Sequence, residues 1–410
     1  MGVSAGVHVV TVGVPAGAEP DPEAAAVAQA LADAGAPVAS RVAIEDDEGA
    51  LERALAPDDG LTVVLAGAGA GDLVRRVVAR AIGARLVLSE RFLAALEEGY
   101  RRLDRPLPRR AERLALLPQG AQAWTTEHGE PGFVLESGAR AVVVLARDGG
   151  LRTAVERHLV PYARARAAGP GAVFLRTLRT AGVTAGELEE RLAEWLGQRE
   201  SRTGDVAVGL VPGEGEVWVR LRAKGVDAAR ALARVESPVL DALGADCYGR
   251  DAETLELVVG RALLERRLTL AVAESCTGGL LGHRLTSVPG SSAYFERGVL
   301  VYSNRAKEEL LGVPAEVLRV HGAVSAPCAE AMARGAAERA GTACALAITG
   351  IAGPDGGTPA KPVGTVFVGL AVEGRASARR FRFLGDRASV KWQSTQAAFD
   401  MLRRALRGRT

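Results

Sequence analysis

Residues 268–279 read Leu-Thr-Leu-Ala-Val-Ala-Glu-Ser-Cys-Thr-Gly-Gly, an apolar run that ends in small polar residues and two glycines. The run predicts a buried β-strand from Leu268 to Ala273, and the spacing of apolar residues after it predicts a helix. A serine between a strand and a glycine-opened helix resembles the elbow that presents a nucleophile in hydrolases. The unpaired N–H groups at such a helix start can hold an oxyanion or a phosphate. Ser275 is therefore the candidate nucleophile.

A lysine and a phenol follow this elbow, within Tyr302-Ser303-Asn304-Arg305-Ala306-Lys307. Serine with lysine is a known pairing of nucleophile and base. Taken alone, these residues leave alternatives open. Ser275 can be an ordinary cap or turn residue, Lys307 can be an ordinary exposed lysine, and Cys276 is a rival nucleophile.

The composition of the whole chain limits its class. At 410 residues it is long enough for two or three domains, and with 48% apolar but 4% aromatic residues its core must consist of Ala, Val and Leu. The net charge of +2 gives no electrostatic reason to expect nucleic-acid binding. Cys247, Cys276, Cys328 and Cys344 lack paired spacing, which argues against zinc or disulfides and favours a reducing compartment. With no signal peptide and no apolar segment of membrane-spanning length, we expect a soluble cytoplasmic protein.

The first part of the chain alternates strands and helices, which predicts a parallel sheet covered on both faces. A glycine-rich loop, Gly67-Ala68-Gly69-Ala70-Gly71, follows one of these strands. It matches neither the dinucleotide fingerprint nor a P-loop, so a flexible connection is favoured over a bound nucleotide. The predicted elements are strands at 7–14, 38–44, 61–66 and 141–146, and helices at 23–34 and 72–82.

A smaller unit follows the boundary Gly169-Pro170-Gly171. Its predicted order is strand, helix, hairpin and helix, which resembles a KH-type α+β module. This module has no Gly-x-x-Gly loop of the kind that clamps nucleic acid, so a spacer that orients its neighbours is the favoured interpretation. The predicted elements are a strand at 173–178, a helix at 185–196, a hairpin at 206–221 and a helix at 228–243.

The third part contains the elbow and two further loops at element ends. Ser325 and Asp386 are predicted N-caps. An arginine at position 387 opposes the helix dipole, unless an anion lies there. In an open α/β sheet such loops gather along one edge and build the ligand site. The predicted elements are helices at 255–266 and 325–340, a helix from 386, and strands at 268–273, 298–303, 343–348 and 362–372, with a last strand ending at 384.

Several sequence blocks together resemble the CinA C-terminal domain in order and spacing. They cover nearly all of residues 255–406, which makes the resemblance specific. The blocks are Ala273-Glu274-Ser275-Cys276-Thr277-Gly278-Gly279, Gly290-Ser291-Ser292-Ala293-Tyr294-Phe295, Tyr302-Ser303-Asn304-Arg305-Ala306-Lys307, His321-Gly322-Ala323-Val324-Ser325, Gly350-Ile351-Ala352-Gly353-Pro354-Asp355-Gly356-Gly357, Lys361-Pro362-Val363-Gly364-Thr365-Val366 and Gly385-Asp386-Arg387.

This resemblance implies an activity and a set of site residues. The CinA C-terminal domain, also found alone as PncC, deamidates nicotinamide mononucleotide (NMN) to nicotinic acid mononucleotide and ammonia. The family's Ser-Lys dyad corresponds to Ser275 and Lys307, with Tyr302 as helper in returning the proton. The expected substrate-binding residues are Thr277, Gly278 and Gly279 for the oxyanion, and Thr349, Gly350, Gly353 and Arg387 around the ribose phosphate. This chemistry needs no metal and no cofactor.

The first domain departs from the family. In relatives it carries Gly-Thr-Glu-Leu, Gly-Gly-Leu-Gly-Pro-Thr-x-Asp-Asp and Leu-Pro-Gly-x-Pro blocks, which are associated with a metal-dependent pyrophosphatase for ADP-ribose-like substrates. Magnesium needs carboxylates beside substrate phosphates, and most of these carboxylates are missing. We therefore expect a retained fold, a lost pyrophosphatase site and no divalent metal. The corresponding stretches here read Gly13-Val14-Pro15-Ala16-Gly17, Ala66-Gly67-Ala68-Gly69-Ala70-Gly71-Asp72 and Leu145-Ala146-Arg147-Asp148-Gly149.

The sequence thus predicts an α/β protein of three domains: a molybdopterin-binding-like domain at 1–168, a KH-type module at 169–247 and a CinA C-terminal deamidase domain at 248–410. The expected function is a cytoplasmic nicotinamide-nucleotide amidase in pyridine-nucleotide salvage. From the resemblance we expect a homodimer or higher homo-oligomer, with no nucleic-acid or membrane partner. The alternatives are a non-catalytic interaction protein in competence or damage response, or residual ADP-ribose pyrophosphatase activity in the first domain.

Overall fold

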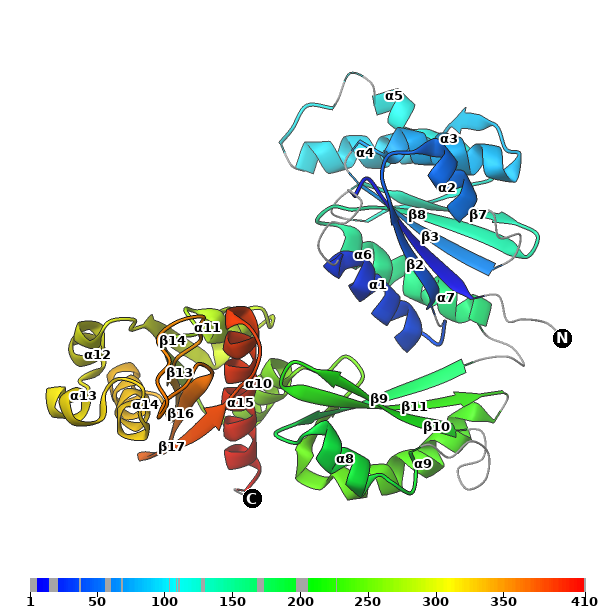
Figure 1. Ribbon diagram of the computed structural model, residues 1–410. Coiled ribbons are helices and arrows are strands. Elements are labelled where there is room, and N and C mark those ends of the chain that lie inside the picture. Colours follow the sequence, from blue (N-terminus) through cyan, green and yellow to red (C-terminus); the bar gives the residue numbers. More distant parts are fainter. Residues whose placement is uncertain are drawn as a thin grey trace. The chain divides into compact units, whose positions relative to one another are not determined.

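The structure is a computed structural model that describes residues 6–14, 21–36, 38–55, 60–67, 69–102, 104–107, 109, 111–126, 130–167, 173–196, 206–225 and 227–408 (Figure 1). The predicted boundary at Gly169-Pro170-Gly171 lies outside these residues, as do positions 15–17 and 68 of the first domain. The chain divides into two compact units, Met1–Leu175 with Arg222–Leu232, and Arg176–Leu221 with Ala233–Thr410. Helices packed on several sheets confirm the predicted α/β class. In the described part of the chain, no helix combines the length and apolar character needed to span a bilayer.

The first unit is built on a six-stranded sheet of order β2-β1-β3-β8-β7-β6. The four predicted strands, β2, β1, β3 and β8, are parallel as expected, whereas β7 and β6, which were not predicted, are antiparallel to their neighbours. The cause is a hairpin: Ser137 pairs with Arg140, which leaves a two-residue turn that only antiparallel strands can use. The strands are β1 (Val7–Val12), β2 (Val38–Ile44), β3 (Gly60–Ala66), β6 (Gln122–Trp124), β7 (Gly132–Ser137) and β8 (Arg140–Ala146), with a separate pair β4 (Leu86–Leu88) and β5 (Leu116–Pro118).

Helices cover both faces of this sheet (Figure 1). Because side chains alternate along a strand, Val9 and Val63 pack with α1 and α7, while Val10 and Val64 face α2, α3 and α4. Both faces are apolar, as expected for strands buried on two sides. The helices are α1 (Pro22–Asp33), α2 (Glu48–Ala54), α3 (Gly71–Ile82), α4 (Glu90–Arg102), α5 (Ala111–Leu114), α6 (Leu151–Ala154), a π-helical turn (Val155–Leu159) and α7 (Val160–Ala167).

The middle module is a four-stranded sheet of order β10-β11-β9-β12 with two helices. The predicted hairpin and its long second helix are present, but the first helix ends five residues before the predicted Leu196, at Arg191. A fourth strand was not predicted: β12 pairs antiparallel with β9. The elements are β9 (Val173–Ala181), α8 (Ala185–Arg191), β10 (Val206–Gly213), β11 (Glu216–Lys224), α9 (Ala228–Leu243), a 3-10 turn (Gly244–Asp246) and β12 (Cys247–Arg250).

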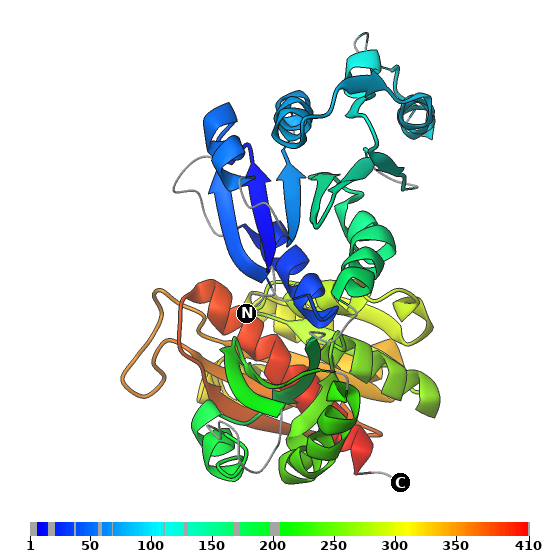
Figure 2. The same ribbon diagram turned by 90° about the vertical axis from the view of Figure 1, so that its right-hand side faces the viewer.

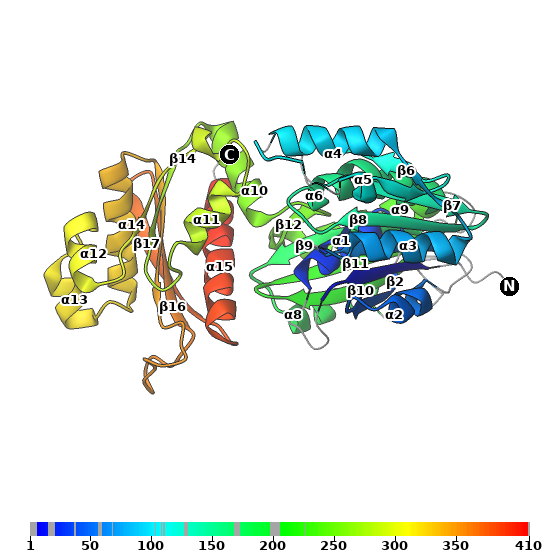
Figure 3. The same cartoon turned by 90° about the horizontal axis from the view of Figure 1, so that it is seen from above.

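The remaining elements form a five-stranded sheet of order β14-β13-β15-β16-β17 between two helical layers. Figure 3 shows this sheet between α14 on one side and α15 on the other. The strands are β13 (Leu270–Glu274), β14 (Phe295–Leu300), β15 (Cys344–Gly350), β16 (Thr365–Val372) and β17 (Arg375–Arg382). The helices are α10 (Leu255–Arg266), α11 (Leu280–Thr286), a 3-10 turn (Ser291–Ala293), α12 (Asn304–Leu311), α13 (Ala315–His321), α14 (Ala326–Ala340) and α15 (Arg387–Arg407).

The two faces of this sheet are packed differently. Toward α14 the strands present small side chains, including Ala271 and Ala345, and a Cβ on Gly369 would lie 2.1 Å from the Ala329 carbonyl oxygen. The close approach of α14 therefore requires small residues. The opposite face presents larger side chains such as Leu346 to α10 and α15. The parallel strands β13 and β15 both end at one edge, where the segment between β15 and β16, orange in Figures 2 and 3, extends away from the sheet.

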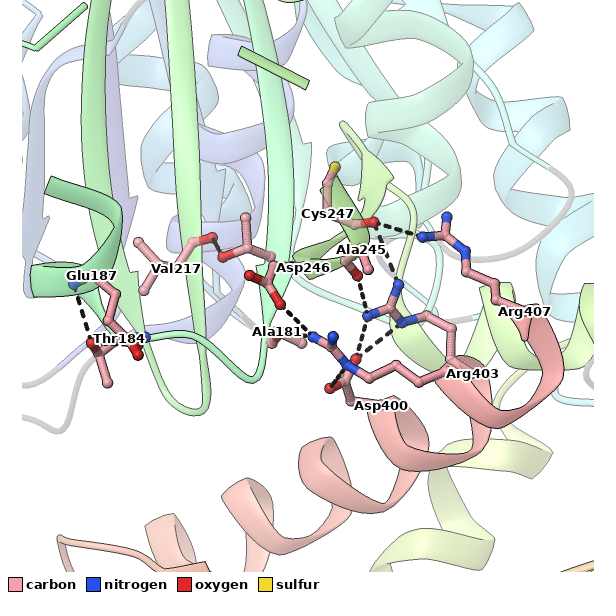
Figure 4. Close-up of polar contacts among 12 residues, drawn as sticks. Ala181, Thr184, Glu187, Val217, Ala245, Asp246, Cys247, Asp400, Arg403 and Arg407 are labelled. Atoms are coloured by element: carbon pink, nitrogen blue, oxygen red, sulfur yellow. Dashed lines mark hydrogen bonds and ion pairs between the residues drawn. The ribbon is translucent and has the colours of Figure 1, made fainter. Parts of the chain in front are cut away.

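Helix α15 also contacts the middle module through buried charges. Figure 4 shows Asp400 and Arg403 of this helix facing the chain around Asp246. The Arg403 guanidinium donates to the Ala245 carbonyl at 2.9 Å, and Arg404 donates to the Asp246 carboxylate at 2.7 Å. A helix of the third sheet therefore has hydrogen-bonding partners in the module that precedes it.

Candidate active site

Ser275 lies directly after β13, at the edge where the parallel strands end. Its backbone N–H donates to the Ile348 carbonyl at 3.0 Å, which ties the elbow to the neighbouring strand β15. The chain then turns through Gly278 and Gly279, with φ of 64° and 97°. Glycine adopts these angles without the strain that a Cβ would bring. The turn places the Ser275 side chain, 8% exposed, at the start of α11.

Lys307 meets this serine from α12. Ser303 caps that helix by accepting from the Ala306 N–H at 3.0 Å, and one turn later Lys307 points into the core with 1% of its surface exposed. Its Nζ lies 3.1 Å from Ser275 Oγ, 2.8 Å from the Val301 carbonyl oxygen and 3.2 Å from the Tyr302 carbonyl oxygen. The structure therefore brings together the two residues of the predicted dyad.

The surroundings of Lys307 favour the neutral amine. Burial lowers its pKa, and the nearby Cys328 and Cys276 oppose this only in part. A neutral amine has two N–H donors and one lone pair. The carbonyls of Val301 and Tyr302 can accept both donors, and the lone pair is then directed at the Ser275 hydroxyl. This arrangement suits a base that takes the serine proton.

The neighbouring cysteines do not compete well as nucleophiles. Burial raises the pKa of Cys276 to about 12 and that of Cys328 to about 11, so both remain thiols near neutral pH. The thiolate, and not the thiol, is the reactive form of cysteine. Ser275 with a neutral Lys307 is therefore the better nucleophile at this elbow.

Glu274, which the sequence analysis did not single out, holds the start of α11. The residue is 2% exposed, and its carboxylate accepts from the N–H groups of Gly279 at 3.1 Å, Leu281 at 3.0 Å and Gly282 at 2.8 Å. A carboxylate at this position also interacts favourably with the helix dipole. The anion site expected at the helix start is thus occupied by the protein's own side chain.

This occupancy narrows the choice of oxyanion donors. Gly279 donates to Glu274, and the Gly278 N–H donates to the Ser275 carbonyl at 3.2 Å. Among the described residues, the N–H groups of Cys276 and Thr277 have no backbone acceptor. The Thr277 hydroxyl is likewise buried without a partner in that part of the chain. Of the predicted oxyanion donors, only the N–H group of Thr277 is therefore left free among the described residues. The N–H group of Cys276, which was not predicted, is also free.

We expect Glu274→Gln to lower both stability and turnover. Glutamine offers one acceptor oxygen in place of two and would direct N–H groups at backbone N–H groups, which costs about 1–3 kcal/mol. A displaced elbow should reduce kcat about 10- to 100-fold, because misplacement of a nucleophile by about 1 Å has effects of this size. Calorimetric stability and NMN deamidation, the reaction that the resemblance implies, would be compared with those of Glu296→Gln on exposed β14. A loss of stability with unchanged kcat would restrict Glu274 to helix capping.

Arg387 and Tyr302 lie together beside the Ser275 elbow. We call the place that these two side chains and Lys391 surround the mouth of the site. One Arg387 nitrogen donates to the Gly353 carbonyl at 2.8 Å, and another lies 3.5 Å from the Tyr302 hydroxyl. Tyr302 is 65% exposed, and its phenol lies beside Arg387. Its contact with Lys307 is made by the backbone carbonyl. The predicted helper role of the phenol in proton return has no contact to carry it among the described residues.

A second cation at this mouth was missed by the sequence analysis. Lys391 is half-buried on α15, and its Nζ would lie 3.7 Å from a Cβ added to Gly278. It follows Arg387 by four residues, so both side chains lie on the same face of the helix. The four-residue spacing of Arg387 and Lys391 was the signal in the sequence that could have identified Lys391. Together the two cations give the mouth a positive charge.

The remaining predicted substrate residues shape the strand ends. The Thr349 hydroxyl donates to the Ala323 carbonyl at 2.8 Å, and Thr349 is 1% exposed. A Cβ on Gly350 would lie 2.7 Å from a Val366 methyl, and one on Gly353 would lie 2.6 Å from Val363. These residues bring the loop close to the sheet. Of the three, Gly353 has a direct link to the site, through its carbonyl on Arg387.

The sequence matches two known protein families, which together cover nearly all of residues 175–406. The pattern of the CinA C-terminal domain matches residues 252–406, and that of the damage-inducible protein CinA KH domain matches residues 175–249. A CinA-like protein of Geobacter sulfurreducens is 40% identical over 396 residues, covering 94% of this chain and 95% of that protein. The chain belongs to the CinA family. A CinA-like protein of Gemmatimonas aurantiaca is 37% identical over 398 residues, covering 94% and 92%.

Among solved structures, a competence-damaged protein (CinA) superfamily protein from Klebsiella pneumoniae is 40% identical to this CinA chain. It covers 38% of this chain and 96% of its own, with a TM-score of 0.37.

Proposed function

We propose that this CinA protein is an amidohydrolase that converts NMN to nicotinic acid mononucleotide and ammonia through Ser275 and Lys307. The observation that carries the proposal is the 3.1 Å approach of Lys307 Nζ to Ser275 Oγ, with both amine N–H groups held by backbone carbonyls. The substrate follows from the family resemblance. A role in pyridine-nucleotide salvage then follows from substrate and product.

The reaction would proceed through an acyl-enzyme. Ser275 Oγ attacks the carboxamide carbon as its proton moves to Lys307 Nζ. The N–H groups of Cys276 and Thr277 stabilise the developing oxyanion, each by roughly 3 kcal/mol if aligned. When the C–N bond breaks, Lys307 returns the proton to the leaving ammonia. Water, deprotonated by Lys307, then hydrolyses the ester and releases the carboxylic acid.

The cations at the mouth suit a phosphorylated substrate. Arg387 keeps donors beyond its bond to Gly353, and Lys391 has no counter-ion among the described residues. Guanidinium groups bind phosphate in bidentate fashion, and ammonium groups bind it as point charges. With the carboxamide at Ser275, these two residues are placed to receive the phosphate of NMN.

For the rest of the chain we propose the three-domain division at 1–168, 169–247 and 248–410. The first domain would act in assembly, with its pyrophosphatase chemistry lost, and the KH-type module would orient its neighbours. Release of AMP from ADP-ribose by the first domain in the presence of a divalent metal would contradict this assignment. We further propose that the protein is a cytoplasmic homo-oligomer.

Ser275→Ala should abolish NMN deamidation, by about 10⁴-fold or more in kcat, because the nucleophile is removed while the binding groups remain. Cys276→Ala should keep turnover within about tenfold, since its buried thiol takes no part in the chemistry. The measurement is release of ammonia and nicotinic acid mononucleotide in the presence of EDTA.

The two variants serve as controls for each other, because they change adjacent residues of one turn. Loss of activity in Cys276→Ala with retention in Ser275→Ala would assign the reaction to the cysteine. A folded wild-type protein without turnover would favour the alternative, an interaction protein that has kept the fold of an enzyme.

A further inference from the structure

The second compact unit contains a cavity between the middle module and the CinA C-terminal domain. Its volume is about 640 Å³, and its walls are the turn between β9 and α8, the hairpin turn between β10 and β11, the end of β17, and α15. Ala181 and Asp400, both labelled in Figure 4, lie on two of these walls. Pockets between domains often bind small molecules, and ligand sites have volumes of about 300–1,000 Å³. The cavity therefore has the position and the size of a ligand site.

Two aromatic rings form part of the β17 wall. Phe381 of β17 and Phe383 just after it lie on the same face of the strand, and their rings stack with centroids 5.5 Å apart. Both residues line the cavity and are half-buried, so part of each ring is open to it. Aromatic side chains favour contacts with other planar rings. This wall suits a ligand that contains an aromatic ring.

The α15 wall presents a hydrogen-bond donor that the chain does not use. Gln396 lines the cavity and is 3% exposed. Its Oε1 accepts from the Arg284 guanidinium at 2.6 Å, which fixes the orientation of the amide because arginine is only a donor. The Gln396 Nε2 group then has no acceptor among the described residues. A buried N–H group without a partner is costly, so an acceptor in the cavity would complete the hydrogen bonding of this residue.

Arg379 gives the cavity a positive charge. It lines the cavity from the same face of β17 as the two phenylalanines, with its guanidinium 5.1 Å from the centroid of the Phe381 ring. Among the described residues, no carboxylate forms an ion pair with it. A guanidinium that stacks on an aromatic ring keeps the N–H groups at its edge available for an acidic group.

The carboxylates that line the cavity have partners within the chain. Asp400 accepts from Arg404 at 2.7 Å. Glu216 accepts from the Tyr248 hydroxyl at 2.5 Å and lies 3.8 Å from Arg179. Neither carboxylate therefore needs a cation from outside. The cavity thus keeps an unpaired cation and a free N–H donor, which together suit a ligand with acceptors and a negative charge.

We propose that this cavity binds a small molecule in which an aromatic ring carries an acidic group, of about the size of a nucleoside monophosphate. The ring lies against Phe381 and Phe383, while Gln396 donates to an acceptor beside it. Arg379 pairs with the acidic group. The walls come from the regions that match the CinA KH domain and the CinA C-terminal domain, so the site requires both. It is separate from the Ser275 elbow and does not rest on the proposed deamidase function.

The test is binding of adenosine monophosphate (AMP) to the full chain in EDTA, measured by titration calorimetry. All proteins would carry Arg387→Ala, so that this cation at the mouth of the Ser275 site does not contribute. We expect one equivalent of AMP to bind, and adenosine, which lacks the acidic group, to bind about tenfold more weakly or worse. Arg379→Ala should weaken AMP binding by about tenfold or more. Arg382→Ala is the matched control, because this exposed arginine lies on the same strand with its side chain on the opposite face, and it should bind AMP as the parent does.

Two further measurements make the outcome independent of one substitution. Phe383→Leu keeps an apolar side chain but removes the ring, and it should weaken AMP binding about fivefold. In the parent, AMP should slow backbone hydrogen exchange in residues 181–185 and 212–217, which line the cavity from the middle module. Arg379→Ala and Arg382→Ala should melt at the temperature of the parent, because both arginines are exposed.

Nicotinate distinguishes two kinds of acidic ligand, because its carboxylate is attached directly to its ring. If nicotinate binds in place of AMP and loses affinity in Arg379→Ala, the same recognition holds for a ligand with the acidic group on the ring. If neither compound binds to the parent, or if Arg379→Ala binds AMP as the parent does, the proposal is overturned. Exchange protection by AMP that is confined to residues outside the cavity would overturn it too.

Discussion

Replacement of Lys307 by methionine should abolish the proposed amide hydrolysis and at the same time stabilise the fold. Methionine fills nearly the same volume but has neither lone pair nor charge, so Ser275 loses the base that takes its proton. General-base removal from such a unit costs about 10³-fold or more in kcat/KM. The stability gain follows because Lys307 is 1% exposed and no carboxylate contacts it among the described residues. Residues that destabilise the fold but are needed for the reaction are typical of active sites.

The pH dependence of folding stability shows in which direction Lys307 changes that stability. Burial lowers the pKa of Lys307 in the folded state, whereas in the unfolded chain it returns to about 10.4. At pH values below the folded pKa both states bind the proton, and the folded state carries the full cost of a buried charge. Between the two pKa values the unfolded state binds more protons, so stability rises with pH through that window. In Lys307→Met this rise should disappear.

The same protonation controls activity. In the wild type, kcat/KM should increase with pH as Lys307 becomes neutral, with a midpoint below the usual range of lysine. Calorimetric melting at several pH values and pH–rate profiles are the measurements. Lys224→Met, the same change at an exposed lysine of β11, is the matched control and should alter neither. A Lys307→Met protein that is active, or less stable than wild type at neutral pH, would contradict a neutral Lys307 acting as base.

The elements that the sequence predicted well are those with local signals. Helix α10 begins and ends at the predicted residues, and Ser325 and Asp386 cap their helices as expected. A cap or an apolar period is set by neighbours within a few residues, which a sequence displays directly. Strand β14 was predicted at 298–303 but spans Phe295–Leu300. It lies at the edge of its sheet and mixes charged with apolar residues, so its limits depend on pairing with β13.

The residues of the candidate site also fall into two groups: those with a local sequence signal were predicted, and those placed by packing between distant segments were not. Ser275 and Lys307 were predicted because each stands in a block matching the family, at the end or start of an element. Backbone roles were not predictable: the contact of Tyr302 with Lys307 uses a carbonyl, which every residue has. The capping role of Glu274 and the position of Lys391 depend on how α11 and α15 approach the elbow. Such packing between distant segments has no local signal.

The largest stability loss should come from Asp400→Leu in the contact between α15 and the middle module. Asp400 accepts from Arg403 and, at 2.7 Å, from Arg404. Arg403 is 1% exposed, and its other partners are the neutral carbonyls of Ala245 and Cys247. Without Asp400, the Arg403 charge stays buried with no counter-ion. Breaking a buried pair in this way costs about 3–5 kcal/mol.

The two ends of this pair are not equivalent, which makes the prediction sharper. In Arg403→Met the Asp400 carboxylate keeps Arg404, so this variant should be less destabilised than Asp400→Leu. The double variant Asp400→Leu/Arg403→Met should recover most of the loss, because it removes the stranded charge together with its partner. Calorimetric unfolding of the full chain measures all three. Glu309→Ala at the exposed pair with Arg305 is the control, with an expected change of about 0.5 kcal/mol or less.

If Asp400→Leu proved as mild as this control, the buried charges would not hold α15 to the middle module. Equal losses in both single variants and the double variant would mean that packing volume, and not the stranded charge, determines the effect. In the expected order of stability, Asp400→Leu is the least stable variant and the double variant is about as stable as Arg403→Met. This order instead requires the Arg403 guanidinium to remain in place when the Asp400 carboxylate is removed. Its bonds to the Ala245 and Cys247 carbonyls provide the means. The stability of the last helix would then depend on the chain segment that precedes the CinA C-terminal domain.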